Sequence, residues 1–267
     1  MTRKFLALFL SIFFLLISTK IILADYATSY QSYIDTTGNY QSAYNGYLTA
    51  RASYFASGNL DSEDKARAAT LKMLQSRNNV VVSYLNAVNA KVQATLGLDD
   101  GDKSSLQNQI NTENSWYTAH TTKLNSAGSL QDLVSDSDEA KSQFQNSTQI
   151  TIYQNLIAMG VANNSYIRGE IVNEINTLQL KIDEIKSNQD KDTSVVERSL
   201  VDVKNKISRS QDKDNLAKNL VGSIKPQNSQ GNNDFTDAQS YLADSNSYLK
   251  EANQGLLQII IELKSAN

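Results

Sequence analysis

The sequence predicts an all-α protein of elongated antiparallel helical bundles with coiled-coil-like seams, built from five to seven long helices. The first observation is compositional. The 267 residues include one proline and 11 glycines, fewer than the turns of sandwiches, barrels or doubly wound sheets require. The second is periodic. Large apolar side chains recur at intervals of three and four residues along most of the chain, as they do on one face of a helix. The few alternating stretches fall inside these registers and do not predict strands.

Residues 1–24 have the features of a secretory signal peptide. Arg3 and Lys4 precede a run of apolar residues, and Ala24 stands where the composition turns polar. A basic start, a short apolar centre and a small residue at the exit are the three parts of such a peptide. We therefore expect cleavage after Ala24, so that the mature chain begins at Asp25.

An uncleaved membrane anchor is the alternative for this segment. Residues 5–23 approach the length that a membrane-spanning helix needs, but Lys20 lies near their end. Cleavage would leave 22 basic and 28 acidic side chains, a net charge of −6. This acidic balance argues against nucleic acid and against an anionic membrane surface as partners. The chain has no cysteine, which excludes disulfides and a cysteine nucleophile.

Seven tyrosines define the first mature helix, predicted over 25–56. Their spacing of 4, 3, 7, 4, 3 and 7 residues is a heptad register, in which Thr37 and Arg51 fill the two gaps. The seven are Tyr26, Tyr30, Tyr33, Tyr40, Tyr44, Tyr47 and Tyr54. Because a tyrosine buries a large ring and can leave its hydroxyl at a wet edge, we interpret them as a seam against the next helix. The alternative is that the rings form an interaction surface for sugars or peptides.

A short turn at 57–61 makes the next helix, which ends near Leu96, an antiparallel neighbour of the first. Residues equidistant from the turn should then meet. The expected contacts place Tyr33, Tyr40 and Tyr44, mostly buried, against Val81, Tyr84 and Val88. Asp61 or Ser62 is the expected N-cap of this second helix.

A third helix is predicted between a capped turn ending at Asp102 and a stop at Gly128. Its seam has a spacing of 4, 3, 4, 3, 4 and 3 residues at Leu106, Ile110, Glu113, Tyr117, His120, Leu124 and Ala127. His120 is the sole histidine, and no nucleophile or paired carboxylate accompanies it in a way that general acid–base catalysis needs. We interpret it as a seam residue. The sequence predicts no catalytic residue, no cofactor-binding residue and no metal ligand.

Ser129 and Asp132 resemble a capping box that opens a long helical stretch. Within it the best aliphatic seam of the chain is Ile171, Ile175, Leu178, Ile182 and Ile185. A second capping box is predicted at Ser194 and Glu197. After it, the same spacing recurs at Val196, Leu200, Val203 and Ile207. Two such seams joined by a short polar turn predict an antiparallel hairpin over 171–207. Pro226 should end that segment, and a last helix is expected from Asp234 to about Leu263.

The expected organisation is a signal peptide at 1–24, an N-terminal bundle with the tyrosine seam at 25–128, and a C-terminal bundle with the coiled-coil hairpin at 129–267. The function expected first is that of an exported, non-enzymatic structural or interaction protein. It would be periplasmic, on the cell surface or extracellular. No cofactor is expected. Membrane contact is expected at most through an uncleaved N-terminal segment. The sequence is compatible with a homo-oligomer.

Two other functions remain open. One is a helical ligand-binding or adhesion module that uses the face from Tyr26 to Tyr54. The other is a helical pore-forming or membrane-inserting protein, whose marker would be the apolar window Ile150–Val161 exposed as a hairpin tip.

Overall fold

A computed structural model describes residues 20–188, 192–226 and 230–265 of the chain. The described residues are 91% helical and include no strand. The predicted all-α fold with long packed helices is therefore confirmed. Residues 1–19 of the predicted signal peptide lie outside the described residues, and the expected cleavage site at Ala24 falls near the start of the first helix.

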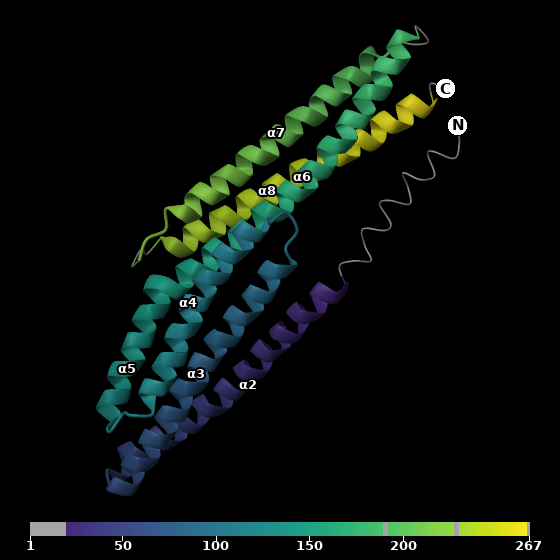
Figure 1. Cartoon of the computed structure of the whole chain (residues 1–267). Coiled ribbons are helices and arrows are strands. Elements are labelled where there is room, and N and C mark those ends of the chain that lie inside the picture. The colour runs from purple at the N-terminus through teal and green to yellow at the C-terminus, as the bar shows by residue number, and fades with distance from the viewer. Residues whose placement is uncertain (1–19, 189–191, 227–229, 266–267) are drawn as a thin grey trace. The chain divides into compact units, whose positions relative to one another are not determined.

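The described helices follow one another with short connections (Figure 1). Their bounds are α2 (Lys20–Ser57), α3 (Leu60–Ala94), α4 (Asp100–Leu124), α5 (Leu130–Gln143), the π-helical turn η1 (Phe144–Thr148), α6 (Gln149–Ser187), α7 (Ser194–Gly222) and α8 (Gly231–Ser265). The chain divides into two compact units. The first contains 20–94 and 100–152, and the second contains 95–99 and 153–265. The division falls inside α6, later than the expected border at residue 128, because α5 packs on α3 and α4.

The turn between α2 and α3 is built by two adjacent residues. Gly58 has a positive φ of 58°, a conformation that glycine adopts without steric cost, and its N–H donates to the carbonyl of Tyr54 at 2.8 Å. The side chain of Asn59 accepts a hydrogen bond from the backbone N–H of Ser62 at 2.9 Å. Asn59 is thus the N-cap of α3, and the expectation of Asp61 or Ser62 in that role is wrong by two or three residues.

The seam of α4 follows the predicted register. Its buried residues are Leu106, Ile110, Glu113, Tyr117, His120 and Leu124. At one end, Leu124 packs with Leu74 of α3 and Leu133 of α5 in a buried apolar cluster. The predicted capping box at the start of α5 is present, with Ser129 and Asp132 satisfying each other's backbone N–H groups. The core of the first unit therefore lies between α3, α4 and α5.

The core of the second unit is one aliphatic seam shared by three helices. It contains Ile171, Ile175, Leu178 and Ile182 of α6, Val196, Leu200 and Val203 of α7, and Leu249, Ala252, Leu256 and Ile259 of α8. The predicted hairpin with facing seams is confirmed, and α8 completes it. The second capping box differs from the prediction. Thr193 is the N-cap and donates its hydroxyl to Glu197 at 2.9 Å, while the Ser194 N–H is bound by the Asp192 carboxylate at 2.9 Å.

Candidate functional site

The helix α2 packs along α3 through a face that alternates tyrosines with small residues. The positions facing α3 are Tyr26, Ser29, Tyr33, Thr36, Tyr40, Ala43, Tyr47, Ala50 and Tyr54, all of them buried or half-buried. They are spaced by three and four residues, so five tyrosines recur every seventh residue with a small side chain between them. Small side chains let two helix backbones approach closely, and the rings then pack into the space beside them.

Contacts across the two helices fix an antiparallel register. The rings of Tyr33 and Tyr84 meet edge to face with centroids 5.1 Å apart. The hydroxyls of Thr36 and Ser83 are 2.6 Å apart. Near the end of the pair, the ammonium of Lys91 lies 5.0 Å from the ring centre of Tyr26. Residues equidistant from the turn meet, as the sequence predicts.

The predicted burial of the tyrosines is only partly right. Tyr33 and Tyr40 are half-buried, but Tyr44 is 41% exposed, so the expectation that it lies mostly buried is wrong. The reason is that Thr36, Ala43 and their small neighbours complete the seam, and Tyr30 and Tyr44 lie one position beside it. The sequence analysis placed all the tyrosines in the seam because their rings are large. In the structure, small residues occupy the seam positions that it had assigned to Tyr30 and Tyr44.

The exposed side of α2 carries large apolar side chains that no other helix covers within the described residues of the first unit. Five of them lie on this helix, namely Tyr30, Ile34, Tyr44, Leu48 and Phe55, with exposed fractions of 44, 45, 41, 41 and 70%. We call these five residues the open face of α2. Within the described part of the first unit, α3 is the one helix that packs along α2, and Figure 1 shows α2 beside it. A concentration of large apolar side chains on one helix face is typical of an interaction site.

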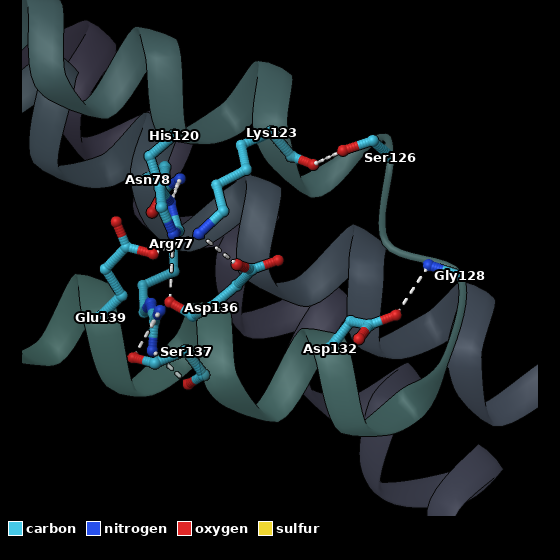
Figure 2. A network of polar contacts seen from close by, with 10 residues as sticks. All are labelled: Arg77, Asn78, His120, Lys123, Ser126, Gly128, Asp132, Asp136, Ser137 and Glu139. Atoms are coloured by element: carbon cyan, nitrogen blue, oxygen red, sulfur yellow. Dashed lines mark hydrogen bonds and ion pairs between the residues drawn. The ribbon is translucent and has the colours of Figure 1, made fainter.

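A second candidate is the polar network around His120, between α3, α4 and α5 (Figure 2). The imidazole Nε2 donates to the backbone carbonyl of Asp136 at 3.0 Å. Because a carbonyl can only accept, the other nitrogen, Nδ1, is the acceptor, and it receives the amide of Asn78 at 2.9 Å. The ring also stacks on Trp116 with centroids 4.8 Å apart. Both ring nitrogens are therefore engaged.

Three side chains of this network are of metal-ligand type. One ligand atom each from His120, Asp136 and Glu139 lies within 4.8 Å of the other two. The ammonium of Lys123, however, binds the Asp136 carboxylate at 2.9 Å and also the Glu139 carboxylate. A cation would have to displace this ammonium and also break one of the two hydrogen bonds of the imidazole. Because the ammonium of Lys123 already pairs with both carboxylates, the arrangement favours a structural role for the cluster.

The electrostatics of the cluster follow from burial and pairing. Burial lowers the pKa of His120 below its usual value, against the opposing effects of the Asp136 carbonyl and of the Glu139 and Asp136 carboxylates. Hydrogen bonds to Glu139 and Asp136 raise the pKa of Lys123. At neutral pH the imidazole is therefore neutral and the ammonium charged.

Sequence reasoning missed a buried carboxylate network beside η1. The Glu113 carboxylate accepts hydrogen bonds from Gln143 at 3.0 Å, Ser147 at 2.5 Å and Thr148 at 2.6 Å. The hydroxyl of Tyr117 is 3.2 Å from that of Thr148. Local π-helical geometry widens the turn and brings two adjacent hydroxyls onto one carboxylate. The seam position of Glu113 and the neighbouring Ser147-Thr148 pair were visible signals, but nothing in the sequence marks a π-turn.

A further buried polar layer crosses the seam of the second unit. Arg168 of α6 binds Asp214 of α7 at 2.6 Å and the hydroxyl of Ser210 at 2.7 Å. Asn164 donates to the same carboxylate at 2.9 Å, and Ser210 contacts Ser245 of α8 at 2.9 Å. The Asp214 side chain is 2% exposed and that of Arg168 is 12% exposed. Polar residues in a coiled-coil seam fix the register of the helices, and this layer has that character.

Comparisons with protein-family models, with curated proteins and with solved structures give no match. Among the helices of the described residues, none is long and apolar enough to cross a membrane. The window 150–161 lies inside α6, where each of its side chains is buried or half-buried. It does not form the exposed apolar tip that a membrane-inserting hairpin requires.

Proposed function

We propose that the chain is an exported structural or interaction protein of the cell envelope or extracellular space, and that it binds its partner through the open face of α2. The observation that carries the proposal is the asymmetry of this helix. One side follows α3 in a regular seam, while the other keeps five large apolar side chains at 41–70% exposure. Leaving so much apolar surface in water is unfavourable, and a partner that covers it would remove that cost.

The buried titratable groups support a non-enzymatic role. His120 has both ring nitrogens engaged, and Glu113 receives three hydrogen bonds. Groups satisfied in this way hold helices together. Catalysis would need one of them within reach of a substrate.

Export is supported by the basic and apolar N-terminus and by the change of composition at Ala24. The test is expression of the full chain in a secreting host, with fractionation and N-terminal sequencing. We expect exported material that begins at Asp25. Retention of Met1–Lys20 in a membrane fraction would contradict the proposal.

The binding role is tested with the mature chain against cell-wall glycans, lipid vesicles and envelope extracts. We expect envelope extracts to retain the wild type and to lose the variant Tyr44→Ser/Leu48→Ser/Phe55→Ser. The matched control is Leu180→Ser on α6, because Leu180 is 73% exposed but lies outside the open face. Equal retention of all three proteins would reject the open face as the binding surface.

An adhesion module is the second candidate, and a specific observation favours it. Tyr30 and Tyr44 are exposed beside three apolar side chains, and exposed aromatic rings suit the stacking of sugars or peptides. Retention on cell-wall glycans that is lost with Tyr30→Ser/Tyr44→Ser would favour this candidate over the first.

A further inference from the structure

Two of the 13 tyrosines of the chain stand apart by their exposure. All the tyrosines lie in the described residues, where Tyr30 is 44% exposed, Tyr44 is 41% exposed and every other one is buried or half-buried. Both lie on α2, two heptads apart. An oxidant that arrives from the solvent therefore reaches these two phenol groups first.

Each of these two exposed rings is the middle member of a tyrosine triad. The centroids of neighbouring rings are 5.9 Å apart in the first triad and 6.0 Å apart in the second. The first triad is Tyr26, Tyr30 and Tyr33, and the second is Tyr40, Tyr44 and Tyr47. Residues three and four apart are neighbours on the surface of a helix, so the helix itself sets this spacing. The most accessible phenols of the chain are thus also the ones with two other phenols beside them.

We infer that Tyr30 and Tyr44 are sites of oxidative cross-linking, each coupling with a neighbouring tyrosine of its own triad to form dityrosine. The inference goes beyond the proposed function and rests on it in one respect, because export brings the chain to a compartment that is oxidising. The co-reactant is a hydroperoxide, which a haem peroxidase uses to oxidise phenols by one electron at a time.

The reaction balances with one molecule of hydrogen peroxide for each cross-link. Each of two phenols gives up one electron and the proton of its O–H group, which leaves two neutral phenoxyl radicals. The radicals join through a new C–C bond between the ring carbons next to the two C–O bonds. The hydrogen on each of these carbons then moves to the phenol oxygen and restores the O–H group. Two ring C–H bonds are broken overall, and the peroxide takes up the two electrons and two protons and becomes two molecules of water.

The geometry of the triads favours coupling within one chain. The exposed ring is oxidised first, and a half-buried ring at 5.9 or 6.0 Å can pass an electron to it. A second oxidation at the exposed ring then leaves two radicals side by side. No helix in the described part of the first unit covers Tyr30 or Tyr44, so each ring is free to rotate toward its neighbour.

A dityrosine link would act on α2 as a disulfide acts elsewhere. The chain has no cysteine, so it cannot form a disulfide in an oxidising compartment. Each predicted link joins residues one helical turn apart, and it restricts the unfolded chain more than the folded helix. The seam with α3 is preserved, because Tyr30 and Tyr44 lie beside it.

The first experiment treats the purified mature chain with a haem peroxidase and hydrogen peroxide. We expect dityrosine fluorescence on monomeric chains, and fragmentation mass spectrometry should place a cross-link in each triad. Tyr30→Phe/Tyr44→Phe keeps the rings but removes the two exposed phenols, and it should lose this fluorescence. The matched control is Tyr166→Phe/Tyr241→Phe, which removes two half-buried phenols outside the triads and should react as the wild type does.

Three results would overturn the inference. The first is an unchanged yield of dityrosine in Tyr30→Phe/Tyr44→Phe, measured on a variant with the circular dichroism spectrum of the wild type. The second is a cross-link that maps to tyrosines outside the two triads. The third is a product that consists of joined chains and whose yield rises with protein concentration, because coupling within a triad does not depend on a second chain.

A second experiment builds a third site. Phe55 is 70% exposed, and its ring centroid lies 5.9 Å from that of Tyr54. This pair has the spacing of the triads but only one phenol, so it cannot form dityrosine. Phe55→Tyr supplies the second phenol, and we expect a new cross-link between residues 54 and 55. Absence of that cross-link would show that exposure and ring spacing do not direct the coupling, and it would overturn the inference.

The inference and the proposed function fail in different ways. A purified chain that gives no dityrosine but is retained by envelope extracts would overturn the cross-linking and keep the interaction function. A purified chain that forms both predicted cross-links but binds no envelope extract would keep the cross-linking sites and reject the proposed binding role.

Discussion

The pair α2–α3 and the three-helix bundle α6–α7–α8 are built on the same 3.5-residue period, yet they bury their seams to different extents. In the bundle, Ile182, Leu200 and Ile259 are at most 2% exposed, because each faces two other helices. In the pair, the five tyrosines of α2 that face α3 have one neighbouring helix and stay half-buried. Periodicity thus predicts which residues share a helix face. The number of neighbouring helices determines how completely that face is buried.

The chemistry of the side chains fits this difference. Aliphatic residues gain free energy only when they are removed from water, so the bundle must close around them. A tyrosine ring can be covered on one side while its hydroxyl stays hydrated. The tyrosine seam therefore tolerates an incomplete bundle, and it leaves the open face available.

The largest expected effect is Leu178→Asp in the seam of the bundle. Leu178 is 9% exposed, so the variant would lose its packing and place a carboxylate among aliphatic side chains. We expect the free energy of unfolding to fall by about 5 kcal/mol or more. Chemical denaturation followed by circular dichroism measures it.

The matched control is Leu180→Asp, two residues along the same helix and 73% exposed. It should change the stability by less than about 0.5 kcal/mol. Equal losses in both variants would mean that helix propensity, rather than burial in the seam, is responsible.

The next effect concerns the polar layer of the same bundle. Asp214→Ala leaves the guanidinium of Arg168 largely buried without its carboxylate, and we expect a loss of about 3–5 kcal/mol. The double variant Arg168→Met/Asp214→Leu should recover most of this stability. Asp61→Ala is the control, since the pair Lys65–Asp61 is 66 and 74% exposed and should contribute less than about 1 kcal/mol.

A smaller effect is expected in the tyrosine seam. Tyr40→Ala removes a half-buried ring that faces α3, and we expect a loss of about 1–2 kcal/mol. Tyr44→Ala is the matched variant beside the seam, and it should cost less than about 0.5 kcal/mol. Thermal melts of the two variants, compared with the wild type, test the register directly. A larger loss of stability for Tyr44→Ala than for Tyr40→Ala would support the register that the sequence predicts, in which Tyr44 is a seam residue.

The sequence was sufficient for the fold class, for the seam of α4 and for the hairpin of α6 and α7, because each depends on local spacing. It was insufficient for the seam of α2, where Tyr30 and Ser29 compete for one seam position and only the approach of α3 decides. It was also insufficient for Arg168 and Asp214. Each continues an aliphatic register, but their pairing across two helices depends on the axial alignment of those helices, which no local pattern encodes.

The smallest expected effect is the pH dependence contributed by His120. Its pKa is lowered in the folded protein because burial disfavours the charged imidazole. The unfolded chain, with a pKa near 6.5, then binds more protons than the folded chain between these two values. The stability that the neutral ring provides is therefore complete above about pH 6.5 and is lost as the pH falls toward the lowered folded value.

This prediction can be measured at a single resonance, because the chain has one histidine. The imidazole signal in the NMR spectrum of the folded protein should titrate below pH 6.5, and the free energy of unfolding should fall between pH 7.5 and pH 5.5. Charges on α5 and α3 face the ring, with Glu139 and Asp136 of α5 favouring protonation and Arg77 of α3 opposing it. In His120→Gln the change over this range should largely disappear, since the pKa values of Asp132, Asp192 and Glu197 are lowered and these groups lose their stabilising charge only in more acidic solution. A titration midpoint above 6.5 would show that the carboxylates, rather than burial, dominate around His120.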